Sequence, residues 1–365
     1  MSRGSARSAG PGWSPDVNNV WGRFLMGSDR LLAIAFVLMV TVALAGITTR
    51  ETQASFTGTS TNPTNQANTM TVQPPAGQNN PTSAAAGVIS LSWSATPTAP
   101  GAGHTLTYLV LRGPVGGPYA QIGSTTTLAY NDTPPADGSY GYVIEAQVAG
   151  GGTFTSGNSA AKTGLSDRLT PTTSITCNAG PCAGWFNATL SVTVTGADGG
   201  SGMGSVTRNV DGAGQTSTAG ASATFNVSGE NAAHTVAYFA TDAAGNASST
   251  SNQTVKIDLT APTAPGSPTS TKGLSAGQID LTWTAGTDAL SGVAGYTIHY
   301  SNAGMSPCAA ATPANYPNTT AVGTVTAYTQ GGLTSGANYC FYITTRDNAT
   351  NSSVASGVAG PTKAK

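Results

Sequence analysis

The strongest constraint on the fold is a strand pattern with a period of two residues that occurs twice along the chain. In each copy, Ile, Leu and Trp alternate with small polar residues, at residues 89–93 and 279–283. A second alternating segment that begins with Tyr follows each copy, at 108–112 and 296–300. Because successive side chains of a β-strand point to opposite faces, each segment would bury one face and expose the other. The repeat predicts half-buried β-sheets built twice on a similar plan.

Two loop signatures are also duplicated, in the same order, at the ends of two β-rich segments. The first signature is Asp-x-x-Ser-Gly, at residues 198–202 and 288–292. The second is Asp followed four residues later by Asn, at residues 242–246 and 347–351. Repeated loops in a repeated order indicate a string of modules of similar architecture.

The composition favours an exported β-protein and excludes one class of partner. Only 8% of the 365 residues are charged, whereas glycine alone contributes 47 residues. Such a balance is typical of turn-rich extracellular domains, and the length suits two or three of them. Nucleic-acid binding requires a patch of Lys and Arg that displaces counterions from phosphate, and the sequence has no basic cluster. We therefore expect no nucleic-acid partner.

The N-terminal region reads as an export signal. Residues 31–47 form an uninterrupted apolar run, preceded by arginines and followed by a charge-poor stretch. The arginine bias places residues 1–30 in the cytoplasm and the rest of the chain outside. A signal or transmembrane helix is expected over 31–48, and its length leaves a cleaved leader and a single-pass membrane anchor both open. Residues 49–84 are too polar to bury a core, so we expect a flexible stalk.

The β-rich segments resemble known extracellular families. The Trp-then-Tyr spacing of residues 85–165 and 264–362 is similar to that of fibronectin type III repeats. Leu333 to Tyr339 resembles the tyrosine corner of that family, which implies a tyrosine hydroxyl bonded to backbone a few residues upstream. Residues 170–260, with a Gly-Trp start and the duplicated loops, resemble a bacterial immunoglobulin-like repeat. The resemblance implies an all-β fold of three tandem sandwiches.

The segment after the apolar run carries a further resemblance. Residues 53–65, with Ala-Ser-Phe followed by Thr and Asn, are similar to the start of camelysin-like exported proteins. In that family the leader is cut by a dedicated signal peptidase. The resemblance therefore implies a cleaved leader and an extracellular or cell-surface location.

The cysteines predict two disulfide bonds. All four fall in the last two β-rich segments, two in each, and the three histidines are too scattered to complete a metal site. We expect the bridges Cys177–Cys182 and Cys308–Cys340, which require an oxidising compartment. Because residues 339, 341 and 343 would face the core, Cys340 should point outward and pin the insertion around Cys308 onto the outer face of the sheet.

The duplicated loops supply a candidate cation site in each of the last two segments. Oxygen-bearing side chains should converge there, and they are Asp198, Asp242 and Asn246 in one segment and Asp288, Asp347 and Asn351 in the other. Calcium takes about six to eight oxygen ligands and would suit either set. The alternative is that these side chains cap their own turns. Both readings stay open, and no cofactor other than calcium is expected.

One aromatic pair is a candidate ligand platform. Sugar binding requires exposed aromatic rings, and Trp93 and Trp283 belong to the core pattern. Trp185 and Phe186 remain, and they could either bind a saccharide or cover the end of the sandwich as strand-start residues.

Catalysis finds little support in the sequence. Glycoside hydrolysis needs paired carboxylates, but Glu145 and Glu230 are isolated and no other glutamate follows Glu51. The chain also lacks a His-Glu-x-x-His motif. We expect a non-enzymatic surface or matrix protein whose array adheres or spaces, with a cell-surface protein or polysaccharide as partner. Alternatives are an accessory, carbohydrate-binding part of extracellular polysaccharide-degrading machinery and an extracellular filament subunit.

Overall fold

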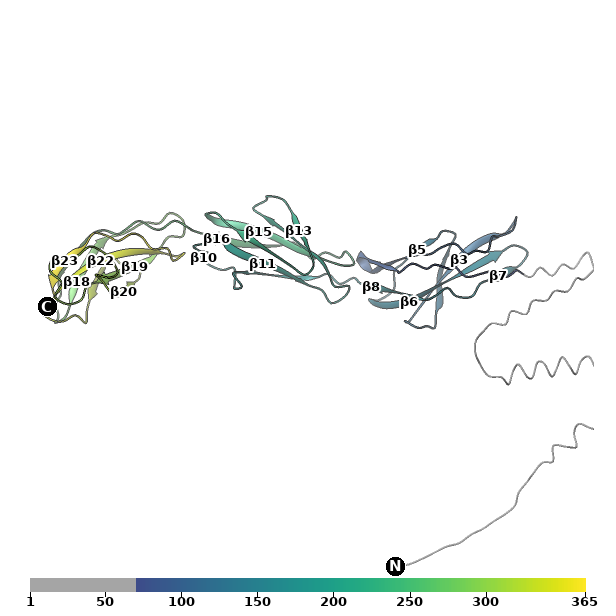
Figure 1. Ribbon diagram of the computed structural model, residues 1–365, viewed down its shortest axis with the longest axis horizontal. Coiled ribbons are helices and arrows are strands. Elements are labelled where there is room, and N and C mark those ends of the chain that lie inside the picture. Colours follow the sequence, from purple (N-terminus) through teal and green to yellow (C-terminus); the bar gives the residue numbers. More distant parts are fainter. Residues whose placement is uncertain (1–69) are drawn as a thin grey trace, which may run out of the picture. The chain divides into compact units, whose positions relative to one another are not determined.

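The computed structural model describes residues 70–365, which form β-sandwiches joined by short linkers (Figure 1). Strands dominate this part of the chain, and its one helical element is a short 3-10 turn. The all-β fold with several sandwiches is therefore confirmed. The predicted leader at 1–30, the predicted helix at 31–48 and the stalk residues before 70 lie outside the described residues. Between residues 70 and 365, no helix is long and apolar enough to cross a membrane.

The first sandwich consists of two antiparallel sheets. Its elements are β1 (Thr82–Ala84), η1 (Ala85–Gly87), β2 (Val88–Ser92), β3 (Thr105–Gly113), β4 (Ala120–Thr125), β5 (Ala129–Asp132), β6 (Gly138–Ala149), β7 (Thr153–Thr155) and β8 (Lys162–Ser166). One sheet has the order β1-β2-β5, and the other has the order β4-β3-β6-β7 with β8 also paired to β6. The core lies between them.

The first sandwich begins earlier than the sequence predicted. Val72 is only 7% exposed and belongs to the core of this sandwich, and Met70 packs against the same core. Gln78 pairs with Trp93 in a β-bridge, and β1 pairs with β2. The predicted boundary at residue 85 is therefore wrong for residues 70–84, which belong to the sandwich rather than to a flexible stalk. The buried Val72, the partly buried Met70 and the pairing of β1 with β2 together anchor this polar segment.

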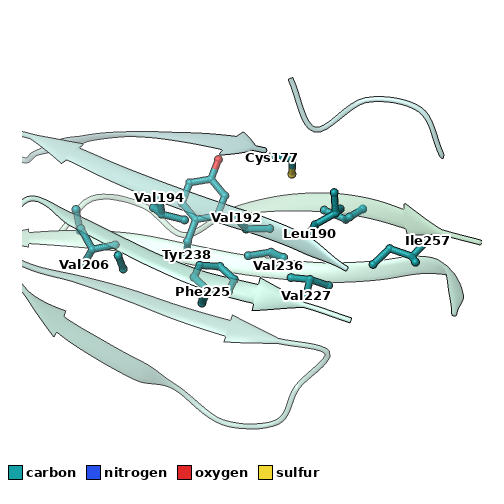
Figure 2. Packing of buried hydrophobic residues seen from close by; sticks show 13 residues of the cluster. Cys177, Leu190, Val192, Val194, Val206, Phe225, Val227, Val236, Tyr238 and Ile257 are labelled. Carbon is teal, nitrogen blue, oxygen red and sulfur yellow. The ribbon is translucent and has the colours of Figure 1, made fainter. Parts of the chain in front are cut away.

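The middle sandwich is built from eight strands. They are β9 (Thr172–Cys177), β10 (Trp185–Phe186), β11 (Leu190–Ala197), β12 (Met203–Val210), β13 (Thr216–Ala219), β14 (Ser222–Val227), β15 (Asn231–Asp242) and β16 (Ser251–Ile257). The sheets have the orders β10-β16-β15-β12-β13 and β14-β11-β9. Figure 2 shows side chains such as Leu190, Val192 and Val236 packed between the strands, as the alternation requires.

The third sandwich contains seven strands. They are β17 (Gly266–Lys272), β18 (Ile279–Thr284), β19 (Val293–Tyr300), β20 (Asn318–Val322), β21 (Ala327–Gln330), β22 (Asn338–Asp347) and β23 (Ala359–Lys363). They form sheets with the orders β17-β18-β21 and β20-β19-β22-β23.

The repeated Trp and Tyr side chains form the same core contact in the first and third sandwiches. Trp93 meets Tyr108 edge to face with ring centroids 5.6 Å apart, and Trp283 meets Tyr296 in the same way at 5.4 Å. All four side chains are buried. The period-two reading of these strands is confirmed, and both tryptophans are committed to packing.

Both predicted disulfides are present. Cys177 is bonded to Cys182, and Cys308 is bonded to Cys340 across 32 residues of sequence. Closing a loop of that length stabilises the fold by about 3–4 kcal/mol in the chain-entropy model. Cys340 lies outside the main core, in a small second cluster with Tyr316. The insertion is thus pinned to the outer face of the sheet, as predicted.

The tyrosine corner of the third sandwich also follows the prediction. The backbone N–H of Thr334 donates to the hydroxyl of Tyr339 at 3.0 Å. This bond fixes the loop before β22 against the start of that strand.

Candidate functional site

The linker between the first and middle sandwiches is bound to a loop of the middle sandwich through one aspartate. Asp167 follows β8 and is 1% exposed. Its Oδ2 accepts a hydrogen bond from the backbone N–H of Ser201 at 2.6 Å, and its Oδ1 accepts from the N–H of Leu169 at 3.0 Å. Burial alone raises the pKa of Asp167, but the hydrogen bonds from Ser201 and Leu169 together outweigh it and hold the pKa below its usual value.

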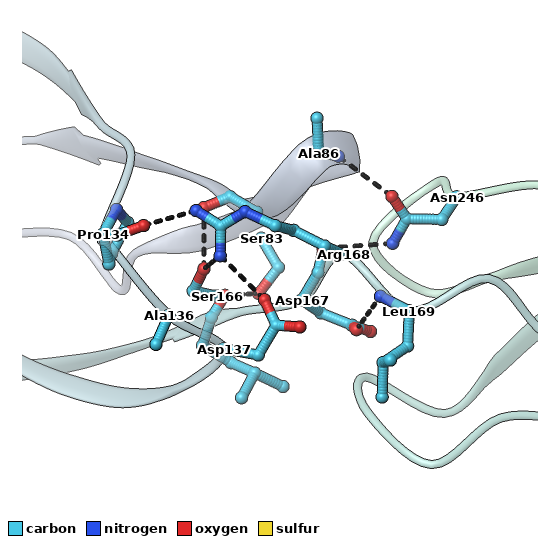
Figure 3. Close-up of polar contacts among 12 residues, drawn as sticks. Ser83, Ala86, Pro134, Ala136, Asp137, Ser166, Asp167, Arg168, Leu169 and Asn246 are labelled. Carbon is cyan, nitrogen blue, oxygen red and sulfur yellow. Dashed lines mark hydrogen bonds and ion pairs between the residues drawn. The ribbon is translucent and has the colours of Figure 1, made fainter.

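A second loop of the middle sandwich completes this contact. The N–H and Nδ2 of Asn246 donate to the two carboxylate oxygens of Asp242, at 2.8 Å and 2.7 Å. Asn246 Nδ2 also donates to the carbonyl of Asp167 at 3.1 Å. Asn246 Oδ1 in turn accepts from the N–H of Ala86, in η1 of the first sandwich, at 2.9 Å (Figure 3). One asparagine side chain therefore contacts the linker and both sandwiches.

The residue after the linker aspartate reaches back into the first sandwich. Figure 3 shows the Arg168 guanidinium bonded to Asp137, Ser166 and the carbonyl of Pro134. The ion pair with Asp137 is 2.8 Å long, and both side chains are about one-third exposed, so it contributes little beyond orientation.

A glycine lies directly against the linker carboxylate at this junction. A Cβ atom at Gly200 would lie 2.3 Å from the Oδ1 of Asp167, so a larger residue there would require the carboxylate to shift. The glycine therefore allows the carboxylate to keep this position beside the Ser201 loop. We call this set, Asp167 with the loops 198–202 and 242–246, the first junction.

The second junction joins the middle and third sandwiches and repeats the hydrogen bonds of the linker aspartate and of the loop asparagine. Asp258, which follows β16, accepts from the N–H of Ser291 at 3.0 Å and from the N–H of Thr260 at 3.1 Å. Asn351 donates through its backbone and Nδ2 to the two oxygens of Asp347, at 2.7 Å and 2.8 Å, and through Nδ2 to the carbonyl of Asp258 at 3.0 Å. The second junction is Asp258 with the loops 288–292 and 347–351.

The same balance of burial and hydrogen bonding acts on the second linker aspartate. Burial raises the pKa of Asp258, and the bonds from Ser291 and Thr260 act in the opposite direction and prevail, so its pKa is lowered. Both linker aspartates are therefore held as anions that accept backbone donors.

The structure brings together the predicted loop residues and adds one carboxylate to each set. Candidate ligand oxygens lie within 4.8 Å of one another in two groups, which are Asp167 with Asp198 and Asp242, and Asp258 with Asp288 and Asp347. The convergence of the loops is confirmed. The linker aspartates were missed because they lie outside the duplicated loops, in linkers whose similarity is weaker.

Most of the carboxylate oxygens in these two groups accept hydrogen bonds from backbone N–H groups. Asp198 accepts from the N–H of Gly200 at 2.9 Å and of Gly202 at 2.8 Å, and Asp288 accepts from the N–H of Gly292 at 2.6 Å. These bonds fit the turn-capping reading. Calcium binding by Asp198, Asp242, Asn246 and their counterparts stays a prediction.

The candidate aromatic platform lies at the edge of the middle sandwich. β10 pairs in parallel with β16, and Phe186 packs against the core. Trp185 is half-buried, and the ammonium of Lys256 lies 5.7 Å from its ring centroid. Phe186 therefore covers the sandwich end, and saccharide binding by the pair stays a prediction.

The architecture defines this part of the chain as a tandem array of β-sandwiches with repeated junctions. The family model of the fibronectin type III domain matches residues 263–358, so the third sandwich contains a fibronectin type III domain. No curated protein matches the chain.

Three solved structures are similar to the chain at low identity. The chicken CNTN1 FN1-FN3 domains share 17% identity, cover 80% of this chain and 96% of their own, and have a TM-score of 0.32. Domains A168-A170 of titin share 14%, cover 81% of this chain and 100% of their own, and have a TM-score of 0.38. An Fn3-like protein from Clostridium thermocellum shares 21%, covers 29% of this chain and 96% of its own, and has a TM-score of 0.21.

Proposed function

We propose that the protein is a non-enzymatic, exported surface or matrix protein in which the sandwich array acts as a spacer that presents its modules for adhesion. The observation that carries this proposal is the repeated junction. Each linker aspartate and each loop asparagine bonds one sandwich or its linker to the next. A linker bound in this way is stiffer than a free chain of the same length.

The chemistry of the described residues also supports an exported, non-catalytic role. All four cysteines are in disulfides, which persist in oxidising compartments. The buried ion pair of the first sandwich is structural: Asp132 accepts from Arg112 at 2.8 Å and from the Tyr142 hydroxyl at 2.7 Å. Its carboxylate is already occupied by two donors, as a structural ion pair requires.

Location is tested on intact cells that produce the full chain. An antibody against the third sandwich should label unpermeabilised cells or their medium, and external protease should remove the label. Labelling that appears only after permeabilisation would contradict an exported role. The size of the mature protein in the same samples distinguishes a cleaved leader from an anchor.

Spacing is tested on the purified array with spin labels on the first and third sandwiches. The proposal expects a narrow distance distribution that broadens when Asp167 and Asp258 are both replaced by alanine. A distribution equally broad in both proteins would show that the junctions do not stiffen the array. The partner, a cell-surface protein or polysaccharide, is sought with the same purified array on whole cells and on immobilised glycans.

A further inference from the structure

One histidine of the middle sandwich is held between two hydrogen-bond acceptors. His234, in β15, is only 7% exposed. Its Nδ1 lies 2.6 Å from the Oδ2 of Asp211, which belongs to the turn between β12 and β13. Its Nε2 lies 3.0 Å from the carbonyl oxygen of Gly229, which belongs to the turn between β14 and β15. The imidazole ring therefore connects two turns of the same sandwich.

These two contacts require a proton on each ring nitrogen of His234. A carboxylate and a carbonyl only accept hydrogen bonds, and a neutral imidazole has a single N–H. Only the imidazolium, with two N–H groups, donates to Asp211 and to Gly229 at once. In the neutral ring the remaining N–H stays with the charged acceptor, because that bond is the stronger one. The contact with the Gly229 carbonyl is then lost.

Three charged groups lie on the elements packed around His234, and one of them faces the ring. They are Asp211 on the β12–β13 turn, Glu230 on the β14–β15 turn and Lys256 on β16. Val255 is opposite His234 in the pairing of β15 with β16, so Lys256 faces the other side of the sheet. The carboxylate of Glu230 is bonded to the linker. Burial lowers the pKa of His234, but its two hydrogen bonds outweigh burial and raise the pKa above 6.5.

The turn that contains Gly229 also contacts the second junction. Glu230 directly follows Gly229, and its Oε2 accepts from the hydroxyl of Thr260 at 2.9 Å. Thr260 is the linker residue whose N–H donates to Asp258 at 3.1 Å. In residues 70–365, no histidine bonds to the groups of the first junction. A change at His234 therefore reaches one junction and not the other.

We propose that His234 is a pH-dependent switch that acts on the second junction. In its charged form it holds the β14–β15 turn in place and keeps Glu230 on the linker. In its neutral form it releases the Gly229 carbonyl, and the bond between Glu230 and Thr260 weakens with the turn. The third sandwich then moves more freely relative to the middle one as the pH rises. This inference rests on the proposed spacer function, because it concerns the stiffness of one joint of that array.

An NMR titration of the purified array tests the protonation step. Below the midpoint, both ring nitrogens of His234 should carry protons. The backbone amides of Glu230 and Thr260 should shift with the same midpoint, above pH 6.5. Asp211→Asn removes the opposite charge and should lower this midpoint by about one pH unit. His234→Gln should remove the transition from both amides.

His104→Gln is the matched control, because His104 lies in the first sandwich and its replacement should leave the midpoint unchanged. Amide dispersion in a two-dimensional spectrum verifies that each variant folds, and Asp211→Asn decides the matter if His234→Gln does not fold. A ring that is already neutral below pH 6.5 overturns the inference. So do amide transitions that persist in His234→Gln, or a midpoint that Asp211→Asn leaves unmoved.

Spin labels on the middle and third sandwiches test the mechanical consequence. The distance distribution should broaden as the pH rises through the midpoint, and in His234→Gln it should be broad at either pH. A distribution that stays narrow across the midpoint but broadens in Asp258→Ala overturns the switch and leaves the spacer function standing. A distribution that is equally broad in the original protein and in Asp258→Ala at either pH overturns the spacer function and the switch together.

Discussion

The first and second junctions use the same hydrogen bonds with different surroundings. In both, a linker aspartate accepts from a serine N–H, and an asparagine bonds the aspartate carbonyl. In the first, Gly200 lies against the linker carboxylate, whereas Leu290 occupies the corresponding position in the second. The first linker bond is also shorter, 2.6 Å against 3.0 Å.

A second difference concerns direct contact between neighbouring sandwiches. Asn246 accepts from the N–H of Ala86 in the first sandwich at 2.9 Å, and at the second junction Asn187 donates to the hydroxyl of Thr350 at 3.3 Å. The first contact is part-buried, and the second is exposed. The two junctions share three groups: an aspartate carboxylate, a serine backbone N–H and an asparagine side chain. They differ in the neighbouring residues, which determine the length of the linker bond and the burial of the contact between sandwiches.

The largest effect is expected from removing the linker aspartates. Asp167→Ala and Asp258→Ala each leave two backbone N–H groups without acceptors, so each should lower the free energy of unfolding by about 1.5–3 kcal/mol. Denaturant unfolding measures the loss, and hydrogen exchange of the Ser201 and Ser291 amides locates it. Slow exchange of these amides in the variants would show that the aspartates do not hold the loops.

The next effect concerns the close approach at the first junction only. Gly200→Ala places a Cβ against the Asp167 carboxylate and should destabilise by about 1–3 kcal/mol. Gly199→Ala is the control, because a Cβ at that position meets nothing within 4 Å. Thermal unfolding compares the two. Equal melting temperatures would mean that the linker moves aside freely and that the junctions are equally loose.

A backbone difference between the junctions predicts a stabilising change. Thr350 has a positive φ of 73°, where the first junction has Gly245 with a φ of 95°. A β-branched residue in this region is strained, so Thr350→Gly should stabilise by about 1 kcal/mol, and Gly245→Thr should destabilise by about 1–2 kcal/mol. Chemical denaturation measures both. A loss of stability in Thr350→Gly would show that its bond from Asn187 outweighs the strain.

Acid should loosen both junctions. The pKa values of Asp167 and Asp258 are lowered below 3.8, so their contribution to stability is fully present above pH 3.8 and is lost as the pH falls through the lowered values. The amide resonances of Ser201 and Ser291 report this protonation in an NMR titration. Midpoints above pH 3.8 would contradict the hydrogen-bonding argument.

His234 is an internal control for that titration, because its contribution to stability changes with pH in the opposite direction. Burial lowers its pKa, but the bonds to Asp211, 2.6 Å away, and to the Gly229 carbonyl prevail and raise it above 6.5. Its contribution is therefore fully present below pH 6.5 and is lost as the pH rises through the raised value. The hairpin that carries Asp211 should weaken at alkaline pH while the first junction stays intact.

The smallest effect is expected from metal removal. Hydrogen-bond donors already occupy most carboxylate oxygens of both junctions, with the buried Oδ1 of Asp198 as an exception. EDTA should therefore change the melting temperature of the array by less than about 1 °C, which corresponds to a few tenths of a kcal/mol. A rise in melting temperature with calcium that Asp167→Asn abolishes would establish a cation site at the first junction instead.

Much of the fold followed from local rules, because burial in a sheet has a two-residue period that the sequence displays. The alternation placed Trp93, Trp283 and Cys340 on the correct faces. The start of the first sandwich was misplaced because Met70 and Val72 are only two apolar residues in a polar segment, too few to display a period. Their burial depends on tertiary contact alone.

The sequence predicted the loops of each junction but not the linker aspartates. The convergence of Asp198 with Asp242, and of Asp288 with Asp347, followed from the duplicated loops. The linker aspartates carried a weaker signal, since each directly follows the last strand of its sandwich and precedes a Thr and a Pro within a few residues.

The division of each joint between two sandwiches has an evolutionary consequence. The middle sandwich contributes the loops 198–202 and 242–246 to the first junction, and Asp258 at its other end to the second junction. A tandem duplication of its coding segment would therefore place Asp258 of one copy before the two loops of the next copy, which are the parts that a junction needs. Such a chain can lengthen by whole units, and each added unit would attach to its neighbours without further substitution.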